Sequence, residues 1–147
     1  MKLSTKTRYG MRAMIDLALV HGSEDPITIK ELAKRNRIPE SFLEQLLGTL
    51  RKKGLVRSIR GPQGGYVLGK EPGDIVVADI INSLEGPIKL AECIDDMPLC
   101  GEFRNCPSRI LWTRIKESIE GVTRTTTLKD LISEYEGHDE RKGICND

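Results

Sequence analysis

The order of elements predicted between residues 28 and 68 constrains the fold more than any other feature of the sequence. Thr28 and Glu31 have capping-box spacing and begin a short amphipathic helix. A second helix follows after a short connection, because four leucines recur at i, i+3, i+4 and i+7: Leu43, Leu46, Leu47 and Leu50. Two short strand candidates, 55–60 and 66–68, then flank a glycine- and proline-rich turn. This order predicts a winged helix-turn-helix, whose second helix can enter the major groove of DNA.

Helices are also predicted on both sides of this unit. Ser4 or Thr5 can cap a first helix that runs to about Val20, since apolar residues recur there at helical spacing. We therefore expect a mainly α protein with a small β-hairpin wing, followed by a dimerisation helix. The expected division is a DNA-binding domain at 1–70, a cysteine-bearing and dimerisation region at 71–136, and a disordered polar tail at 137–147.

The helices of the second region have their own start and stop signals. Asp74 is the expected cap of a helix that carries apolar residues from 76 to 84. Pro107 is expected to open a long helix, which Gly121 should weaken or end. Thr127, three residues before Asp130, can cap the last helix.

The net charge of +1 conceals an asymmetry along the chain. Residues 1–70 contain 14 Lys and Arg against 6 Asp and Glu, a net charge of +8, whereas residues 71–147 have a net charge of −7. A basic half attracts a polyanion, so this division favours a nucleic-acid-binding module joined to a region of another role. Chance alone could also produce an excess of this size.

Candidate DNA contacts lie at the start of the second helix and on the wing. Gln45 suits adenine edges and Glu44 can accept from cytosine N4, while Ser41 can address either kind of base. Arg57 and Arg60 can reach phosphates or the minor groove from the wing. For each of these residues alone, a solvated surface position is an equally good explanation.

Cysteine spacing indicates chemistry in the acidic half. Cys93, Cys100 and Cys106 fall within fourteen residues, and Cys145 lies near the end of the chain. We expect a reducing, cytoplasmic location because the N-terminus does not have the features of an export signal, and clustered cysteines there are more often metal ligands or redox groups than disulfides. The spacing lacks the paired CxxC of a zinc ribbon, so an iron–sulfur cluster is favoured over zinc. Three reduced cysteines on a flexible loop are the simpler alternative.

An enzyme is not indicated by the sequence. His21 and His138 are isolated, and no Ser/His/Asp or Cys/His arrangement is evident. Residues 64–70 approach a phosphate-binding loop, but Glu71 stands where a hydroxyl should bind magnesium and the interior has the character of a strand. No apolar run is long enough to span a membrane, so no membrane partner is expected.

An apolar stripe on the long helix predicts a homodimer. Its residues recur at intervals of three and four: Trp112, Ile115, Ile119 and Val122. A region this small has little interior to cover such a stripe, and exposed apolar patches favour association. Packing of the stripe on the protein's own core is the alternative.

Four segments and the three clustered cysteines together resemble a known family. The segments are 1–10, 41–45, 50–55 and 60–69. They resemble the iron–sulfur cluster regulator IscR and its nitric-oxide-sensing NsrR-type relatives, which are bacterial winged-helix transcription factors. The resemblance implies a homodimer on double-stranded operator DNA and a 2Fe–2S cluster in the loop before the dimerisation helix. It also implies base contacts by Ser41, Glu44 and Gln45 and a DNA contact by Arg60. Genes of iron–sulfur cluster assembly or stress would be its targets; repression is expected, although the sequence does not distinguish it from activation.

The sequence departs from this family at the fourth ligand of the cluster. Arg109 stands where IscR has its ligand histidine, and Arg8 stands where some relatives supply a carboxylate from the partner subunit. The first cysteine gap is also one residue longer. The fourth ligand is therefore open, and the oxygen-bearing candidates besides a partner-chain residue are Glu92, Asp95, Asp96, Glu102 and Ser108.

Three functions follow as hypotheses. The first is a cluster-sensing transcriptional regulator. The second is a regulator of the same fold in which the three cysteines sense oxidants as thiols without a metal. The third, of a different class, is an adaptor that carries a cluster without binding DNA.

Overall fold

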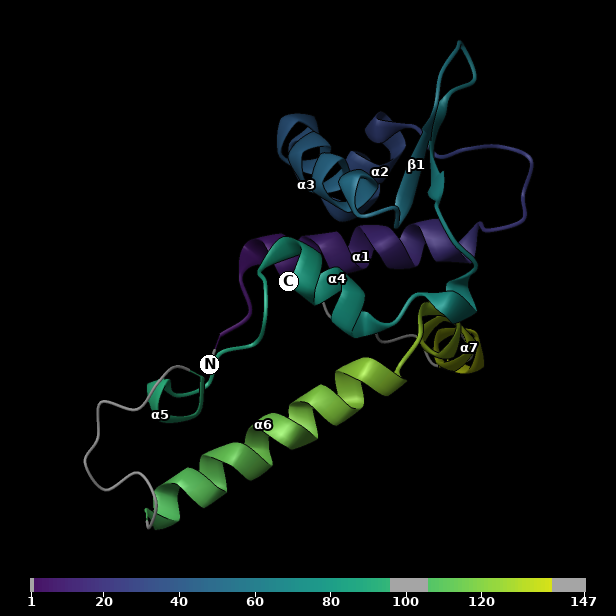
Figure 1. Ribbon diagram of the computed structural model, residues 1–147. Coiled ribbons are helices and arrows are strands. Elements are labelled where there is room, and N and C mark those ends of the chain that lie inside the picture. Colours follow the sequence, from purple (N-terminus) through teal and green to yellow (C-terminus); the bar gives the residue numbers. More distant parts are fainter. Residues whose placement is uncertain (1, 96–105, 139–147) are drawn as a thin grey trace.

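The computed structural model describes residues 2–95 and 106–138. Its elements in chain order are α1 (Thr5–Leu19), α2 (Ile29–Asn36), α3 (Glu40–Lys52), β1 (Val56–Ile59), β2 (Gly65–Leu68), η1 (Pro72–Asp74), α4 (Val77–Leu84), α5 (Glu92–Asp95), α6 (Pro107–Thr125) and α7 (Leu128–His138). Helix α1 lies between two layers, with α2, α3 and the hairpin on one side and α4 on the other (Figure 1). The expected mainly α fold with a β-hairpin wing is confirmed.

The N-terminal caps form largely as the sequence predicts. The hydroxyl of Ser4 accepts from the Thr7 amide at 3.2 Å and begins α1. The hydroxyl of Thr28 accepts from the Glu31 amide at 3.2 Å and begins α2. The carboxylate of Glu31 does not return to Thr28 but pairs with Arg35 at 2.9 Å, so only half of the expected capping box is present.

The connection between α2 and α3 depends on one unusual backbone conformation. Arg37 has a φ of 55°, in the left-handed region that glycine normally occupies. The amide of Ile38 then bonds back to the Ala33 carbonyl at 3.1 Å, which closes the end of α2. Pro39 precedes α3 as its N-cap.

The wing is a two-stranded antiparallel hairpin with one additional bridge. Val56 pairs with Leu68 at its base, and Ile59 pairs with Gly65 near its tip. Ile27, which lies outside the predicted strands, joins the hairpin: Ile27 and Tyr66 exchange two backbone hydrogen bonds of 3.1 and 2.8 Å. A Cβ on Gly65 would collide with the backbone of Ile27, so this close approach requires glycine.

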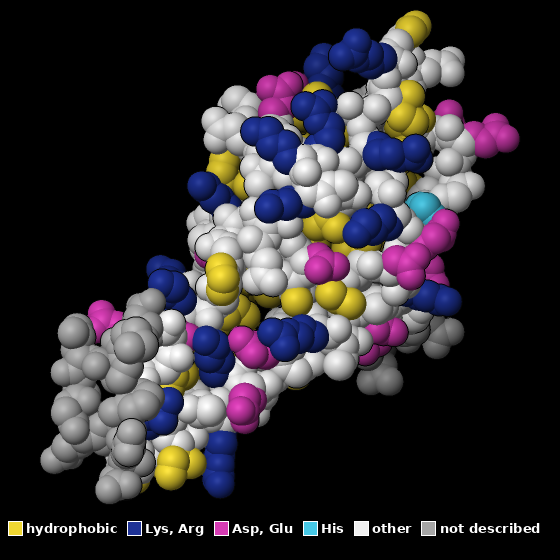
Figure 2. Space-filling view, in the orientation of Figure 1, with side chains coloured by type: hydrophobic (Ala, Val, Ile, Leu, Met, Phe, Trp, Pro, Cys, Tyr) yellow, Lys and Arg dark blue, Asp and Glu magenta, His cyan; other side chains and the backbone are white. Residues whose placement is uncertain are grey.

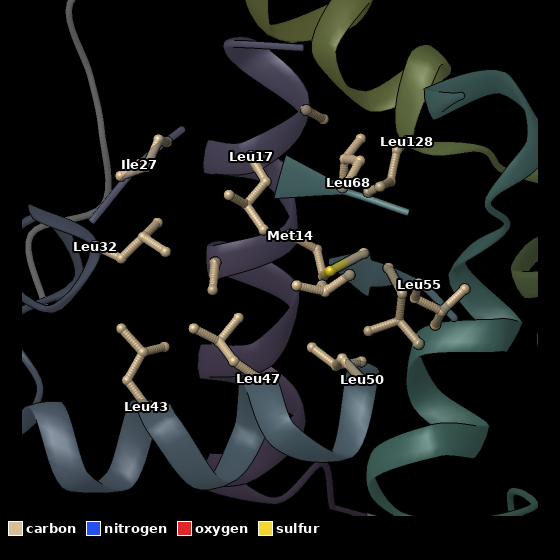
Figure 3. Packing of buried hydrophobic residues seen from close by; sticks show 14 of the residues in the cluster. Met14, Leu17, Ile27, Leu32, Leu43, Leu47, Leu50, Leu55, Leu68 and Leu128 are labelled. Carbon is tan, nitrogen blue, oxygen red and sulfur yellow. The ribbon is translucent and has the colours of Figure 1, made fainter. Parts of the chain in front are cut away.

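One hydrophobic core joins both halves of the chain. Figure 3 shows Met14 and Leu17 of α1 facing the leucines of α3 on one side and Leu68 and Leu128 on the other. Three residues beyond position 70, Ile75, Ile80 and Leu128, are fully buried in this cluster. Helices α4 and α7 therefore share the hydrophobic core of the winged helix.

The start of α4 differs from the expectation. Asp74 does not cap it but closes the short helix η1, and α4 begins after Val76, whose amide reaches the carboxylate of Asp79 at 3.4 Å. Backbone bonds from Val77 to Thr126 and from Leu128 to Ile75, both 2.9 Å, fix this segment beside the α6–α7 junction. A tertiary bridge thus sets the start of α4.

Helix α6 is the least covered long element of the described chain. Pro107 opens it as predicted, but it continues past Gly121 to Thr125, so the expected stop there is wrong. None of its nineteen residues is fully buried. Helix α7 runs to His138, and residues 139–147 of the predicted tail lie outside the described residues. In the part of the chain that the structure describes, no helix is long and apolar enough to cross a membrane.

Candidate nucleic-acid interface and metal centre

The five candidate DNA contacts are all exposed and lie on two neighbouring elements. Ser41, Glu44 and Gln45 lie in the N-terminal half of α3, on the opposite face from its buried leucines. Arg57 lies on β1 and Arg60 follows it toward the wing tip. None of these side chains forms a hydrogen bond or ion pair with another residue of the described segments, so each is available to a ligand.

The surface around these residues is predominantly basic. Figure 2 shows Lys and Arg side chains across α2, α3 and the hairpin, in the upper half of the view, with Asp and Glu more frequent below. This distribution agrees with the net charge of +8 in residues 1–70. Arg51 was not singled out in the sequence, but its guanidinium reaches Ser58 on β1 at 3.3 Å and ties the end of α3 to the wing.

Two of the three clustered cysteines lie on described elements. Cys93 belongs to α5 and Cys106 is the N-cap residue of α6; both are half-buried free thiols. Cys100 and the tail residue Cys145 lie outside the described residues. The structure therefore describes the first and the third of the three clustered cysteines.

Arg109 connects the two cysteine-bearing segments. Its backbone amide donates to the Cys106 carbonyl at 3.2 Å, and its side-chain Nε donates to the Cys93 carbonyl at 3.4 Å. The side chain at this position, where the resemblance implied a ligand histidine, is thus a cation beside Cys93, whereas the contact with Cys106 is made by the backbone. A guanidinium cannot bind a metal, but as a cation it attracts anionic groups nearby.

One candidate for the fourth ligand, Asp95, has other partners in this structure. The carboxylate of Asp95 pairs with Lys116 and accepts from the amides of Leu90 and Ala91 at 2.5 and 2.9 Å. Lys116 is the largest cause of a lowered pKa at Asp95, and the two amides act in the same direction. Asp95 is therefore committed to holding α5 on α6.

The other oxygen-bearing candidates remain. Glu92 and Ser108 are exposed beside Cys93 and Cys106, whereas Asp96 and Glu102 lie outside the described residues. Residues 2–95 and 106–138 contain no group of three metal-binding side chains. The donor set of thiols with one open position nevertheless suits iron, and the site residues fit a cluster in their chemistry.

The predicted dimerisation stripe is only partly exposed. Trp112 is 37% and Val122 is 65% exposed, while Ile115 and Ile119 are half-buried. Two neighbours that the sequence analysis did not include, Ile110 and Leu111, are 59% and 51% exposed. Ile119 lines an apolar groove of about 460 Å³ between α6 and the end of α4, together with Leu3, Ile81, Pro87 and Ile88.

Comparison with known proteins gives matches over almost the whole chain. Residues 3–134 match the Rrf2 family, described as iron-dependent transcriptional regulators. The chain is 47% identical to the transcriptional regulator CymR of Bacillus subtilis, over 95% of this chain and 96% of that protein.

Solved structures agree with the sequence match. The structure of CymR (YrzC), the global cysteine regulator of B. subtilis, is similar with a TM-score of 0.79 and 46% identity, over 91% of this chain and 98% of that one. The structure of T. potens IscR has a TM-score of 0.75 and 40% identity, over 99% and 94%. An oxidised form of Staphylococcus aureus CymR has a TM-score of 0.72 and 35% identity, over 99% and 100%.

The winged helix, the exposed side chains on α3 and the wing, and these similarities agree with one another. The relatives are named as transcriptional regulators and not as enzymes. The chain belongs to the Rrf2 family and is a DNA-binding transcriptional regulator.

Proposed function

We propose that this protein is a homodimeric regulator that senses its signal through a 2Fe–2S cluster held by Cys93, Cys100 and Cys106. The observation that carries the proposal is the placement of Cys93 and Cys106. They are free thiols at the two ends of the segment that contains Cys100, and Arg109 bonds to the carbonyls of both. A bound cluster would supply a group that oxidants or nitric oxide modify under mild conditions.

The charge of the site supports an anionic occupant. A cluster with several thiolate ligands is negatively charged, and the Arg109 guanidinium provides a compensating cation beside it. Lys116 engages Asp95 in an ion pair. Among the described residues, the remaining candidates for the fourth position are Glu92 and Ser108, and a residue of the partner chain is a further candidate. Oxygen ligands bind iron less strongly than thiolates, so this position is the labile one.

The dimer interface is formed by α6. Its exposed apolar residues Ile110, Leu111 and Trp112 lack cover from the chain's own core. The adjacent groove beside Ile119 offers a second copy an apolar surface to fill. A two-fold dimer would present two α3 helices to the two halves of a palindromic operator.

The proposed roles at the DNA follow from position. Ser41, Glu44 and Gln45 would read base edges in the major groove, because they are exposed on the helix that the fold presents. Arg57 and Arg60 would contact phosphates or the minor groove from the wing. Genes of iron–sulfur cluster assembly or stress would be the targets.

A second candidate is a regulator that senses oxidants through the same thiols without metal. Two findings favour it: the relative at 46% identity is described as a cysteine regulator, and another CymR is known in an oxidised form. The presence of Arg109 where the resemblance implied a ligand histidine favours it as well, because a guanidinium cannot bind a metal. The third hypothesis, a carrier that does not bind DNA, does not agree with membership of the family.

Anaerobic purification separates the two candidates. The cluster proposal predicts a coloured protein with iron and inorganic sulfide in equal amounts, whose DNA binding changes when the cluster is removed by a chelator. The thiol candidate predicts a colourless protein without iron, whose DNA binding changes on treatment with hydrogen peroxide and is restored by a reductant. A colourless protein with unchanged DNA binding under both treatments contradicts both.

A further inference from the structure

A row of three side chains on α1 contacts both sides of the turn that precedes the recognition helix. Tyr9, Arg12 and Asp16 are spaced by three and four residues, which places them on one face of α1. This α1 row is outside the DNA-contacting set described above. Tyr9 contacts Phe42, Asp16 contacts Asn36, and Arg12 contacts the ring of Tyr9.

The first contact of the α1 row is aromatic. The Tyr9 ring meets the Phe42 ring edge-on, with centroids 6.2 Å apart and an interplanar angle of 90°. The Arg12 guanidinium lies 5.6 Å from the centroid of the Tyr9 ring, within range of a cation–π interaction. Phe42 is the third residue of α3 and follows Ser41 directly, so this contact fixes the turn that carries the first base-reading candidate.

The second contact is polar and lies on the other side of the turn. Asp16 Oδ2 accepts from Asn36 Nδ2 at 2.8 Å, and the same nitrogen donates to the Leu32 carbonyl at 2.9 Å. Asn36 is the last residue of α2 and only 3% exposed. Burial raises the pKa of Asp16, although the Asn36 hydrogen bond and the charges of Arg35 and Arg12 oppose the rise.

The turn between these two contacts needs external support. Arg37 has a φ of 55°, a conformation that is unfavourable for a residue with a side chain. Such a conformation persists only where the surroundings determine it. The backbone bond from Ile38 to Ala33 closes the turn locally. The α1 row adds support from outside, because it anchors Asn36 immediately before the turn and Phe42 soon after it.

We propose that Tyr9, Arg12 and Asp16 are positioning residues for operator reading: they set the pose of α3 relative to α2 without touching DNA. This inference rests on the proposed role of α3 in reading bases. Base readout depends on hydrogen-bond geometry, whereas attraction to the phosphates depends mainly on charge. Loosening the row should therefore reduce sequence discrimination more than it reduces general affinity for DNA.

The test compares disruptive with conservative variants at two positions. Tyr9→Ala removes the ring and Tyr9→Phe keeps it; Asp16→Ala removes the acceptor and Asp16→Asn keeps an amide oxygen that can accept from Asn36. The probes are a duplex enriched from a random pool by the wild-type protein and a random-sequence duplex of equal length. Thermal unfolding of each variant verifies that it is folded at the assay temperature, and Tyr9→Leu replaces Tyr9→Ala where folding fails.

The proposal predicts a change in discrimination. Both alanine variants should bind the enriched duplex about 3- to 10-fold more weakly, with affinity for the random duplex and its salt dependence unchanged. The two conservative variants should stay within about twofold of the wild type. Equal losses on both duplexes, or no loss on either, would overturn the proposal. A wild-type protein that enriches no sequence would instead contradict the proposed role of α3 itself.

Discussion

Lys116 of α6 forms an ion pair with Asp95 of α5, and the Asp95 side chain is only 3% exposed. The same carboxylate accepts from the amides of Leu90 and Ala91. One acidic residue therefore holds the segment that carries Cys93 against the helix that carries the apolar stripe. In this way the cysteine site and the proposed dimer interface are physically connected.

Asp95→Asn should lower stability in a pH-dependent way. Lys116 and the two amides lower the pKa of Asp95, so the ionised carboxylate stabilises the fold above its unfolded pKa of about 4. That contribution is lost as the pH falls through the lowered folded value. Urea unfolding should show a loss of up to about 1 kcal/mol at pH 7, because the Lys116 side chain is partly exposed and solvent screens the pair.

The control for this variant is Glu92→Gln, which changes an exposed carboxylate on the same short helix. In cluster-free protein, its unfolding midpoint should equal that of the wild type at each pH between 3 and 7. A difference between wild type and Asp95→Asn that does not shrink at low pH would contradict the role given to this ion pair.

Two glycines should respond differently to alanine because their neighbours differ. A Cβ on Gly65 meets the Ile27 backbone, which cannot move without breaking the bridge to Tyr66, so Gly65→Ala should cost about 2–3 kcal/mol. A Cβ on Gly10 meets the end of the flexible Leu84 side chain, and alanine is the better helix former by about 1 kcal/mol. Gly10→Ala should therefore change stability by less than about 1 kcal/mol.

Chemical denaturation of the two glycine variants in parallel measures both effects. Equal losses would show that the wing does not depend on the close approach of Gly65 to Ile27.

The sequence predicted those features that depend on neighbouring residues. The caps at Ser4, Thr28 and Thr127 and the buried leucines of α3 need only local spacing, and all of them are present. In the last cap, Thr127 and Asp130 bond to each other reciprocally at 2.9 and 3.1 Å.

Features that depend on distant partners were not predicted correctly. Asp74 was expected to cap α4, but a bridge between Val76 and Thr127 determines where that helix begins. One incorrect prediction has a local reason instead: Gly121 does not end α6, because one glycine costs a helix only about 1 kcal/mol. Ile27 joins the wing through a single residue pair, which leaves no periodic signal. The ion pair between Asp95 and Lys116 joins residues 21 positions apart, so the spacing of residues in the sequence could not predict it.

Arg60→Ala should weaken DNA binding in a way that reveals what the side chain contacts. A contact with a base or a narrow groove predicts a loss of about 1–3 kcal/mol on the operator alone. A phosphate contact predicts a uniform loss on all sequences and a salt slope reduced by about one. Titration against operator and random duplexes at several salt concentrations distinguishes the two, and unchanged affinity for both would exclude a role for Arg60. Arg57→Ala, measured in the same way, shows which kind of DNA contact the side chain of Arg57 on β1 makes.

Trp112→Glu should shift the protein from dimer to monomer. Trp112 is 37% exposed on a helix that has no fully buried residue, and a charge there would be desolvated in the proposed interface. Light scattering at micromolar concentration should report a dimer for the wild type and a monomer for the variant. Tyr135→Glu on α7, also exposed, is the matched control and should remain dimeric. A monomeric wild type, with and without iron, would exclude the dimer.

The central claim is that three specific cysteines hold an iron–sulfur cluster, and the most direct test is the iron and sulfide content of four alanine variants purified without oxygen. Thiolates are strong ligands for iron, so Cys93→Ala, Cys100→Ala and Cys106→Ala should each lose iron, sulfide and the visible absorption of the cluster. Cys145→Ala should keep all three, because Cys145 lies far along the chain from the other cysteines. Loss of the cluster from Cys145→Ala, together with its retention in any one of the other three variants, would contradict the account.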